Sequence, residues 1–421
     1  MGKLKTLFIG AAAVTCALLM GTSTTAGGFL RGAAYFSAGS FMGDGSAAES
    51  GGTDDNSGSP GGTSLPGSSN VSNVSSVTDV TDVPVVESGS DTESSANSSD
   101  VSDHPQSPSV SESSPAASAA VPVPQKLGKV ITKNRTYGTD DVDYSQFTEN
   151  SGSIDRYNFG YFNDPNIITL SSGAQLRNCT DDENADLLAA SEQLPSLGDF
   201  DGFEIGSEEP QVLIYHTHTS ESFLPYGDSY DADYPIRSGD CTKNMTAVGD
   251  AICKALAERG ISSVHDCTVH DYPIFTGAYY RSEETILEVL EEYPSIKIAI
   301  DIHRDGIITD SGSVIAPIAE INGNTAAQFM IITGCDSPET VIPNYMQNFK
   351  LACLLQNCAE ISYPGLARPV LFDYRNYNQS LFEGCLLIEV GSQGNTLEEA
   401  LYTGDLLGDI IADAIERLAE Q

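Results

Sequence analysis

Three aliphatic or β-branched runs of this chain each end in a histidine or an acidic side chain. They are Val212-Leu-Ile-Tyr-His-Thr-His-Thr-Ser-Glu221, Ile298-Ala-Ile-Asp-Ile-His-Arg-Asp305 and Leu386-Leu-Ile-Glu-Val-Gly391. Such runs are typical of strands buried in a parallel sheet, and open α/β sheets carry their sites at the carboxyl ends of the strands. We therefore expect the three strand ends to meet at one edge of a sheet and to form a single site.

The stretch 207–421 alternates strand and helix patterns. The predicted strands are 212–215, 264–269, 296–302, 327–333 and 386–390, and the predicted helices are 245–259, 283–292, 344–360 and 396–420. The last helix begins with Asn395 and Thr396 and has acidic residues in its first turn, as helix N-termini prefer. The alternation predicts an α/β domain with a mostly parallel sheet and helices on both faces.

The first 30 residues resemble a targeting segment. Lys3 and Lys5 precede an apolar stretch over 7–20, which is followed by small residues up to Ala26. The pattern predicts an exported, extracytoplasmic protein whose leader is either a cleaved signal peptide or an N-terminal membrane anchor. We favour the anchor.

Residues 31–125 have a composition that cannot support a core. Between Arg31 and Lys126 there is no Lys or Arg, and Ser, Gly, Thr and Asp dominate. The segment is predicted to be a disordered acidic linker, with a modified mucin-like stalk as the alternative. Residues 126–206 are predicted to be an N-terminal extension that packs on the core. The net charge of −39 argues against a nucleic-acid partner, because phosphate binding needs a basic surface.

The histidines at the strand ends suggest metal binding. His216 and His218 are two residues apart at the end of one strand, so their side chains can point the same way, and His303 ends a second strand. Glu389 lies in a strand that otherwise reads as buried, where a carboxylate is costly unless it is paired or has a task. The alternatives are hydrogen-bonded histidines without a ligand and an ion pair between Glu389 and Arg304.

The remaining candidate ligands carry less information. The chain has nine cysteines but no Cys-x-x-Cys spacing, and most of them fall within helix or strand patterns as small hydrophobic residues. His265 and His270 are predicted to be core or surface residues without a role in the site.

Several segments, in order, closely resemble the stage II sporulation protein P family. They are Leu213-Ile-Tyr-His-Thr-His-Thr-Ser-Glu-Ser-Phe-Leu-Pro225, Lys243-Asn-Met-Thr-Ala-Val-Gly249, Asp301-Ile-His-Arg-Asp305, Asn376-Tyr-Asn-Gln-Ser-Leu381 and Leu387-Ile-Glu-Val-Gly-Ser-Gln-Gly-Asn-Thr-Leu-Glu-Glu-Ala400. The resemblance covers about residues 207–415. The family looks like a branch of the zinc-dependent N-acetylmuramoyl-L-alanine amidases with a phosphorylase/hydrolase-like α/β fold.

The resemblance implies a function in cell-wall degradation. The substrate is peptidoglycan, and the bond cleaved is the amide between the lactyl group of muramic acid and the first L-alanine of the stem peptide. Endopeptidase cleavage of peptide cross-links is a second activity that the resemblance leaves open. The family acts at the septal wall during engulfment in sporulation, beside stage II sporulation proteins D and M.

The amidase motifs carry over to three residues. His218 and His303 match the two histidine ligands of Zn²⁺, and Glu389 matches the catalytic glutamate. The amidases take a further ligand from a Glu that opens the next helix, where this chain offers only Asp240. We prefer Glu221 as the third ligand, because His-x-x-Glu is a familiar zinc-site spacing.

This ligand set predicts a catalytic rather than a structural zinc site. Two imidazoles and one carboxylate leave a fourth position for water, whose pKa the metal lowers, and Glu389 then moves the proton to the leaving amine. Arg304 is predicted to stabilise the oxyanion or to bind a substrate carboxylate. The candidates for substrate contact are His216, Asn378 and Gln379, the last two with turn formation as the alternative.

Two other classes of protein fit parts of the pattern. A zinc carboxypeptidase acting on stem peptides uses a His-x-x-Glu pair and a later His. A non-catalytic cell-surface module suits the acidic, Ser-rich linker.

Overall fold

A computed structural model describes residues 126–136, 142–147, 152–197, 202–225, 227–309, 311–338 and 340–420. The predicted leader and linker lie outside these residues. Among the described residues, no helix is both long enough and apolar enough to span a bilayer.

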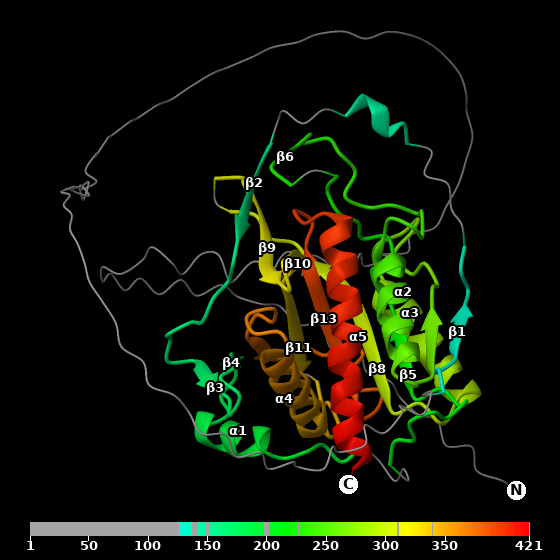
Figure 1. Cartoon of the computed structure of the whole chain (residues 1–421), viewed down its shortest axis with the longest axis vertical. Coiled ribbons are helices and arrows are strands. Elements are labelled where there is room, and N and C mark those ends of the chain that lie inside the picture. The colour runs from blue at the N-terminus through cyan, green and yellow to red at the C-terminus, as the bar shows by residue number, and fades with distance from the viewer. Residues whose placement is uncertain are drawn as a thin grey trace, which may run out of the picture. The chain divides into compact units, whose positions relative to one another are not determined.

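A nine-stranded sheet forms the centre of the described structure (Figure 1). Its order is β1-β7-β5-β8-β13-β11-β12-β4-β3. The strands are β1 (Val130–Lys133), β3 (Ile167–Thr169), β4 (Gln175–Asn178), β5 (Val212–Tyr215), β7 (Ser263–Asp266), β8 (Ile298–Asp305), β11 (Phe329–Gly334), β12 (Val370–Asp373) and β13 (Cys385–Ser392). All neighbours are parallel except the pairs β13–β11 and β3–β4, so the predicted mostly parallel sheet is confirmed.

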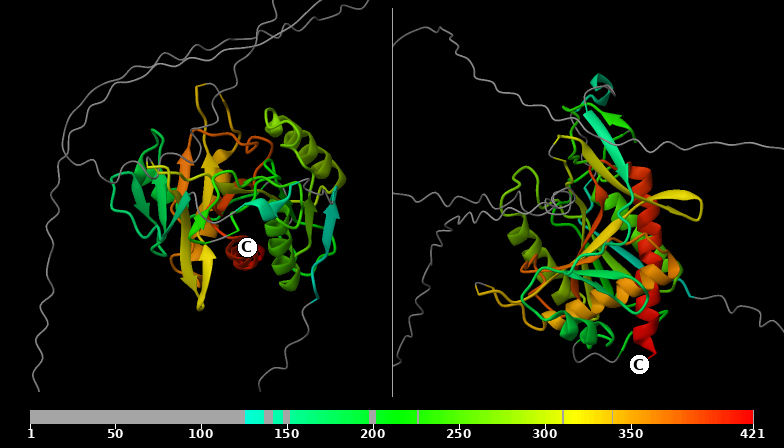
Figure 2. Two further views of the ribbon diagram at one scale, coloured as in Figure 1. Left: turned by 90° about the horizontal axis from the view of Figure 1, so that it is seen from above. Right: turned by 90° about the vertical axis from the view of Figure 1, so that its left-hand side faces the viewer.

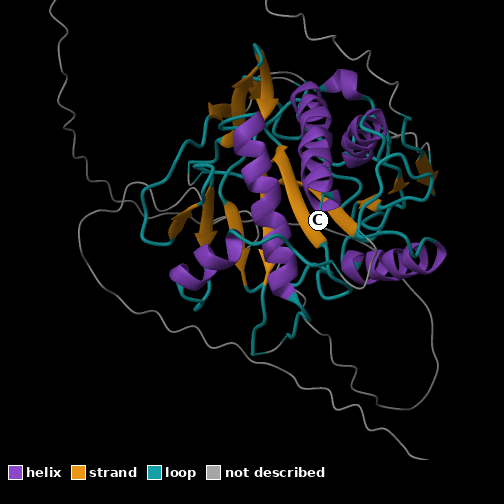
Figure 3. Cartoon of the chain, turned by 60° about the horizontal axis from the view of Figure 1, so that its bottom comes forward, coloured by secondary structure: helices purple, strands orange, loops and turns teal. Residues whose placement is uncertain are grey.

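Helices cover both faces of this sheet, as predicted. Successive residues of β5 alternate between two hydrophobic clusters: Val212 and Ile214 join the first, whereas Leu213 and Tyr215 join the second. The first cluster contains side chains of α2 (Met245–Glu258), α4 (Tyr345–Ser362) and α5 (Leu397–Ala419), and the second contains those of α3 (Ala278–Glu292). Figures 1 and 3 show α2, α4 and α5 together, and in the left view of Figure 2 α3 and α5 flank the strands from different sides.

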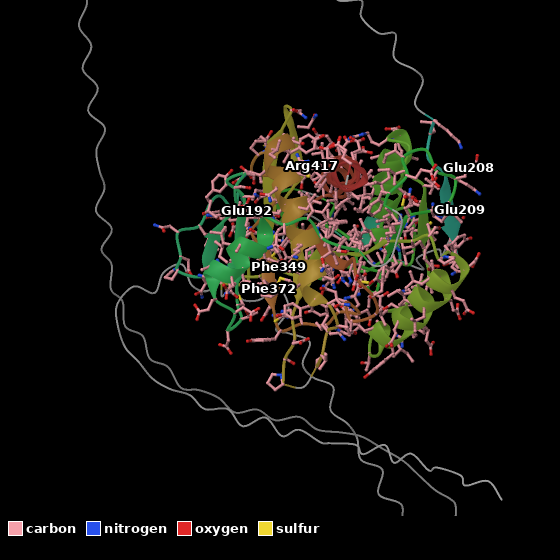
Figure 4. The ribbon with its side chains drawn as sticks, turned by 90° about the horizontal axis from the view of Figure 1, so that it is seen from below. Glu192, Glu208, Glu209, Phe349, Phe372 and Arg417 are labelled. Carbon is pink, nitrogen blue, oxygen red and sulfur yellow. The ribbon has the colours of Figure 1, made fainter. Side chains whose placement is uncertain are left out.

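The larger cluster is closely packed between α4 and the sheet. Phe349 of α4 and Phe372 of β12 are both fully buried, with ring centroids 4.9 Å apart in an edge-to-face arrangement (Figure 4). Helix α5 is fixed at its start by a capping box, in which Thr396 and Glu399 each accept a backbone N–H of the other. Asn395 connects this start to the end of β13, because its side chain accepts the Ser392 N–H and donates to Glu399, both at 2.9 Å.

A second sheet, of four strands, was not predicted from the sequence. Its order is β10-β9-β2-β6, with β2 (Gly152–Tyr157), β6 (Ser229–Tyr230), β9 (Val314–Ile321) and β10 (Asn324–Ala327). The turn Asn322-Gly323 joins β9 to β10, and both residues have positive φ values, of 51° and 81°. The extension 126–206 contributes strands to both sheets and also contains α1 (Asn184–Ser191).

Candidate metal centre

A tight turn after β5 brings together the first two candidate ligands. The Glu221 N–H donates to the His218 carbonyl oxygen at 3.1 Å, so the turn places residues three apart next to each other. Nδ1 of His218 lies 3.6 Å from Oε1 of Glu221. The His-x-x-Glu spacing thus forms a local pair on one side of the turn.

The sheet register brings His303 next to Glu389. Strands β8 and β13 are parallel neighbours (Figure 1). In their register His303 and Glu389 are direct partners. Paired residues on adjacent strands point to the same face of a sheet. Just beyond this pair the register shifts, and Gly391 has a positive φ of 63°. The ladder between β13 and β8 is therefore irregular directly after these two side chains, and pairing resumes between Ser392 and Asp305.

Three side chains form a group that could hold one metal ion. Ligand atoms of His218, Glu221 and His303 all lie within 4.8 Å of one another, and Nδ1 of His303 is 3.7 Å from Oε2 of Glu221. Two imidazoles and a carboxylate are the donor set of a mononuclear catalytic zinc site. Asp240, the alternative third ligand, instead accepts hydrogen bonds from the backbone and hydroxyl of Thr242.

Asp301 lies behind His303, and the sequence reasoning did not assign it a role. Its Oδ1 is 2.9 Å from Nε2 of His303, an ion-pair contact that is not aligned as a hydrogen bond. Asp301 also accepts the backbone N–H of Thr217 at 2.8 Å. Carboxylates in this position fix the orientation of a metal-binding histidine and raise its basicity. The motif Asp-x-His, with both residues on one face of β8, was the available signal.

The two imidazoles differ in their protonation. Burial lowers the pKa of His218 to about 4, and the nearby positive charge of His303 adds to the effect. For His303 burial acts in the same direction, but the carboxylates of Asp301 and Glu221 overcome it and raise the pKa to about 9. Without a metal ion, His303 is therefore a cation held between two carboxylates, and His218 is neutral.

Glu389 is a buried carboxyl group without a full set of partners. Burial raises its pKa to about 8, and the negative charges of Asp305 and Glu221 contribute. Its Oε2 is buried and has no hydrogen-bond partner among the described residues. A buried polar atom left in this way is unusual in a protein core and indicates a group with a task.

The guanidinium of Arg304 does not pair with Glu389. It donates to the carbonyl oxygens of Ser222, Ile236 and Asp305 at 3.0–3.2 Å. The backbone N–H of Arg304 donates to Oε2 of Glu221. These contacts make Arg304 a support for the loop after Glu221, and its predicted contact with an oxyanion or a substrate carboxylate stays a prediction.

His216 lies apart from His218, contrary to the expectation that the two rings share a side. Side chains of β5 alternate between the two faces of the sheet, and His216, directly after the strand ends at Tyr215, still points to the face covered by α2. The turn that follows changes the direction of the chain, so His218 does not point to that face. The ring of His216 is fully buried, Nδ1 is 3.0 Å from the Ile302 carbonyl and Nε2 is 3.0 Å from Nε2 of His265. Burial lowers its pKa to about 3. His216 therefore connects β8 and His265 within the core, behind the segments that carry the candidate ligands.

Asn378 and Gln379 use their side chains within the protein. The Asn378 amide donates to the Tyr279 carbonyl and to the Ser282 hydroxyl, at 3.0 and 2.9 Å. The Gln379 amide bonds both Gly334 N–H and Ile332 carbonyl, at 2.9 and 3.0 Å. These contacts tie the loop to α3 and β11, and the positive φ of 60° at Asn378 is typical of a turn, whereas substrate contact stays a prediction.

Aromatic and basic side chains surround His218. The rings of Phe275 and Tyr279 have centroids 4.6 and 5.5 Å from that of His218. Arg237 lies over Phe275, with 4.6 Å to the ring centroid, and its NH2 is 3.5 Å from Oε1 of Glu221. None of these three residues was singled out from the sequence, because each comes from a loop or a helix start without a motif.

The fold and the site define a class of protein: an α/β protein with a candidate mononuclear metal centre and a buried carboxyl group at the carboxyl edge of a mostly parallel sheet. The family within this class is shown by the sequence. The chain matches the family Stage II sporulation protein P (SpoIIP) over residues 87–412 and belongs to it.

Comparisons with individual proteins give one curated relative and several solved structures. The chain is 30% identical over 215 residues to Stage II sporulation protein P of Bacillus subtilis (strain 168), a match that spans 48% of this chain and only 50% of the relative. The N-acetylmuramoyl-L-alanine amidase AmiC2 of Nostoc punctiforme is similar over 51% of this chain and 100% of its own, at 14% identity and a TM-score of 0.31. The CwlD amidase from Clostridioides difficile, solved in complex with the GerS lipoprotein, is similar over 49% of this chain and 94% of its own, at 11% identity and a TM-score of 0.29.

Proposed function

We propose that this chain is a zinc-dependent N-acetylmuramoyl-L-alanine amidase that degrades peptidoglycan. Membership of the SpoIIP family supports the substrate class. The observation that carries the proposal is the arrangement of the site: His218, Glu221 and His303 lie around one point, and the partnerless carboxyl of Glu389 is in register beside His303.

The three ligand candidates fit Zn²⁺ in number and chemistry. His218 and His303 would supply imidazole nitrogens and Glu221 a carboxylate oxygen, which leaves a fourth position open. When bound, the ion would polarise the scissile carbonyl and acidify a water molecule. Asp301 would hold the His303 ring in the orientation that presents Nδ1 towards Glu221.

Glu389 provides the proton transfer that amide hydrolysis needs. Its carboxylate takes a proton from the attacking water and delivers it to the nitrogen of the leaving L-alanine as the C–N bond breaks. A carboxyl group whose pKa lies well above its ordinary value suits both steps, because it accepts and releases a proton near neutral pH. Arg304 acts indirectly in this proposal, by holding the loop after Glu221 through three carbonyl contacts.

The biological setting is part of the same proposal and rests on family membership. We propose that the chain is exported, is held at the membrane by its N-terminal segment, and acts on the septal wall during engulfment in sporulation. Stage II sporulation proteins D and M are the expected partners. Endopeptidase activity on cross-links is proposed as an additional activity of the same centre.

The test is mass spectrometry of the products from purified sacculi, with and without a chelator, for the wild type and Glu389→Gln. An amidase releases intact stem peptides that begin with L-alanine, and chelation or the substitution stops the release. Activity that survives both treatments would remove the proposal.

Two further substrates separate the alternatives. Stem peptides without a glycan are cleaved by a zinc carboxypeptidase but not by an amidase of this class. A non-catalytic surface module leaves sacculi intact with any divalent metal.

A further inference from the structure

The segment 271–281 comprises the loop that precedes α3 and the first turn of α3, and it contacts the candidate metal centre; we call it the 271–281 loop. Asp271 accepts the backbone N–H and the hydroxyl of Ser220, at 3.0 and 2.6 Å, in the turn between His218 and Glu221. Phe275 and Tyr279 pack against the His218 ring. Three side chains of the loop thus point towards the centre and fix the loop to it.

Arg281 holds the loop from its other end. Its Nε donates to the His270 carbonyl at 2.6 Å, and its two terminal nitrogens donate to Ile274 and Thr276 carbonyls at 2.6 and 3.2 Å. Charge-assisted bonds of this kind are strong, and three of them restrain the backbone of the loop between His270 and Thr276.

The side chains that alternate with the fixed ones are large, apolar and exposed. Tyr272, Ile274 and Tyr280 have exposed fractions of 70%, 64% and 75%. Isolated exposed hydrophobic residues are common, but here three occur within nine positions of a segment that borders the candidate centre. Exposed apolar side chains gathered in one short segment make it a candidate contact surface.

We propose that Tyr272, Ile274 and Tyr280 bind the sugar rings of the glycan strand adjacent to the bond that is cleaved. The proposal rests on the amidase function and names the part of the substrate that this loop recognises. Aromatic side chains offer an apolar face for the C–H groups of a sugar ring and a hydroxyl for its polar edge. The chain's net charge of −39 disfavours polyanions as the occupant, whereas an unmodified glycan backbone has little charge of its own to oppose it.

The test compares a polymer with a short substrate. Rates are measured on intact sacculi and on a muramyl peptide with a single sugar, for the wild type, Tyr272→Ser, Tyr280→Ser and the double variant. The ratio of kcat/KM on sacculi to that on the short substrate is expected to fall about three- to tenfold for each tyrosine. Tyr161→Ser is the matched control, because Tyr161 is 63% exposed but contacts Glu360 on α4, and it should leave the ratio unchanged.

Binding without turnover separates this proposal from the amidase proposal. Metal-stripped protein is sedimented with sacculi and, in parallel, with vesicles of phosphatidylglycerol and phosphatidylethanolamine. Loss of sacculus binding in the tyrosine variants supports the glycan surface even if no substrate is cleaved. A polymer-to-short ratio that stays constant while cleavage proceeds, or a loss confined to vesicle binding, overturns it.

Discussion

Replacing Glu389 with Gln is expected to stabilise the metal-free protein while it removes the activity. Burial and the neighbouring charges of Asp305 and Glu221 raise the pKa of Glu389 from its ordinary value of 4.5 to about 8. The folded state therefore binds this proton more tightly than the unfolded state does. The stability that the carboxyl group contributes is complete below pH 4.5 and is lost as the pH rises towards 8.

The size of this loss follows from the same values. Each pH unit in the interval costs about 1.4 kcal/mol, so the free energy of unfolding falls by roughly 4 kcal/mol across it. A Gln side chain does not titrate, so Glu389→Gln should not show this loss. The difference between the variant and the wild type should therefore grow by about 3 kcal/mol between about pH 5 and pH 8.

The assay is urea unfolding of both proteins in the presence of a chelator at several pH values. Glu288→Gln serves as the control for the substitution itself, because Glu288 is exposed on α3. Zinc-loaded Glu389→Gln should lose about 10²- to 10⁴-fold in kcat while its zinc content stays unchanged. A stability difference that is the same at every pH would refute a buried carboxyl group with a raised pKa.

Three further substitutions test the site and its support. Glu221→Gln should abolish stoichiometric zinc binding, measured by elemental mass spectrometry, and a retained ion would exclude Glu221 as a ligand. In the wild type, zinc affinity should rise about tenfold per pH unit up to about pH 9, because His303 must release the proton that Asp301 and Glu221 help it hold. Asp301→Asn should make zinc affinity less dependent on pH and should weaken zinc binding about 10- to 100-fold, both measured by competition with a chelator. Gly249→Ala places a Cβ 2.5 Å from Nε2 of His265 and 2.8 Å from Nε2 of His216, so it should lower the free energy of unfolding by about 1–3 kcal/mol. Gly306→Ala is the control, because a Cβ at Gly306 meets nothing within 4 Å. Equal urea midpoints for the two variants would contradict the close approach at Gly249.

The strands that carry the site could be predicted because each contains three consecutive aliphatic residues directly before its polar residues or strand end. The runs over 212–215 and 386–390 became the central strands β5 and β13, and the α/β class followed from the helices between them. The strand β9 was missed because Pro317 lies within its apolar run, and a proline there argues against a strand. The Asn322-Gly323 turn after β9 is nevertheless a hairpin signal in the sequence.

The placement of side chains beyond the strand ends could be predicted only in part. His216 and His218 were expected on one side, but the period of two holds only while the strand continues, and β5 ends at Tyr215. The arginines were the hardest to place, because a guanidinium such as that of Arg304 can serve a substrate or three backbone carbonyls with the same sequence. Only the folded conformation of the surrounding backbone shows which of these two roles the guanidinium has.

The direct pairing of His303 with Glu389 has a consequence for how this centre can vary. The distance between the proposed metal ligand and the proposed proton-transfer group is set here by the width of one hydrogen-bonded strand pair, about 5 Å, and not by the length of any loop. Insertions and exchanges in the surrounding loops can therefore change which substrate binds without changing the distance between these two side chains. Slippage of a single residue between these two strands, by contrast, would point one of the two groups into the opposite layer and separate them completely.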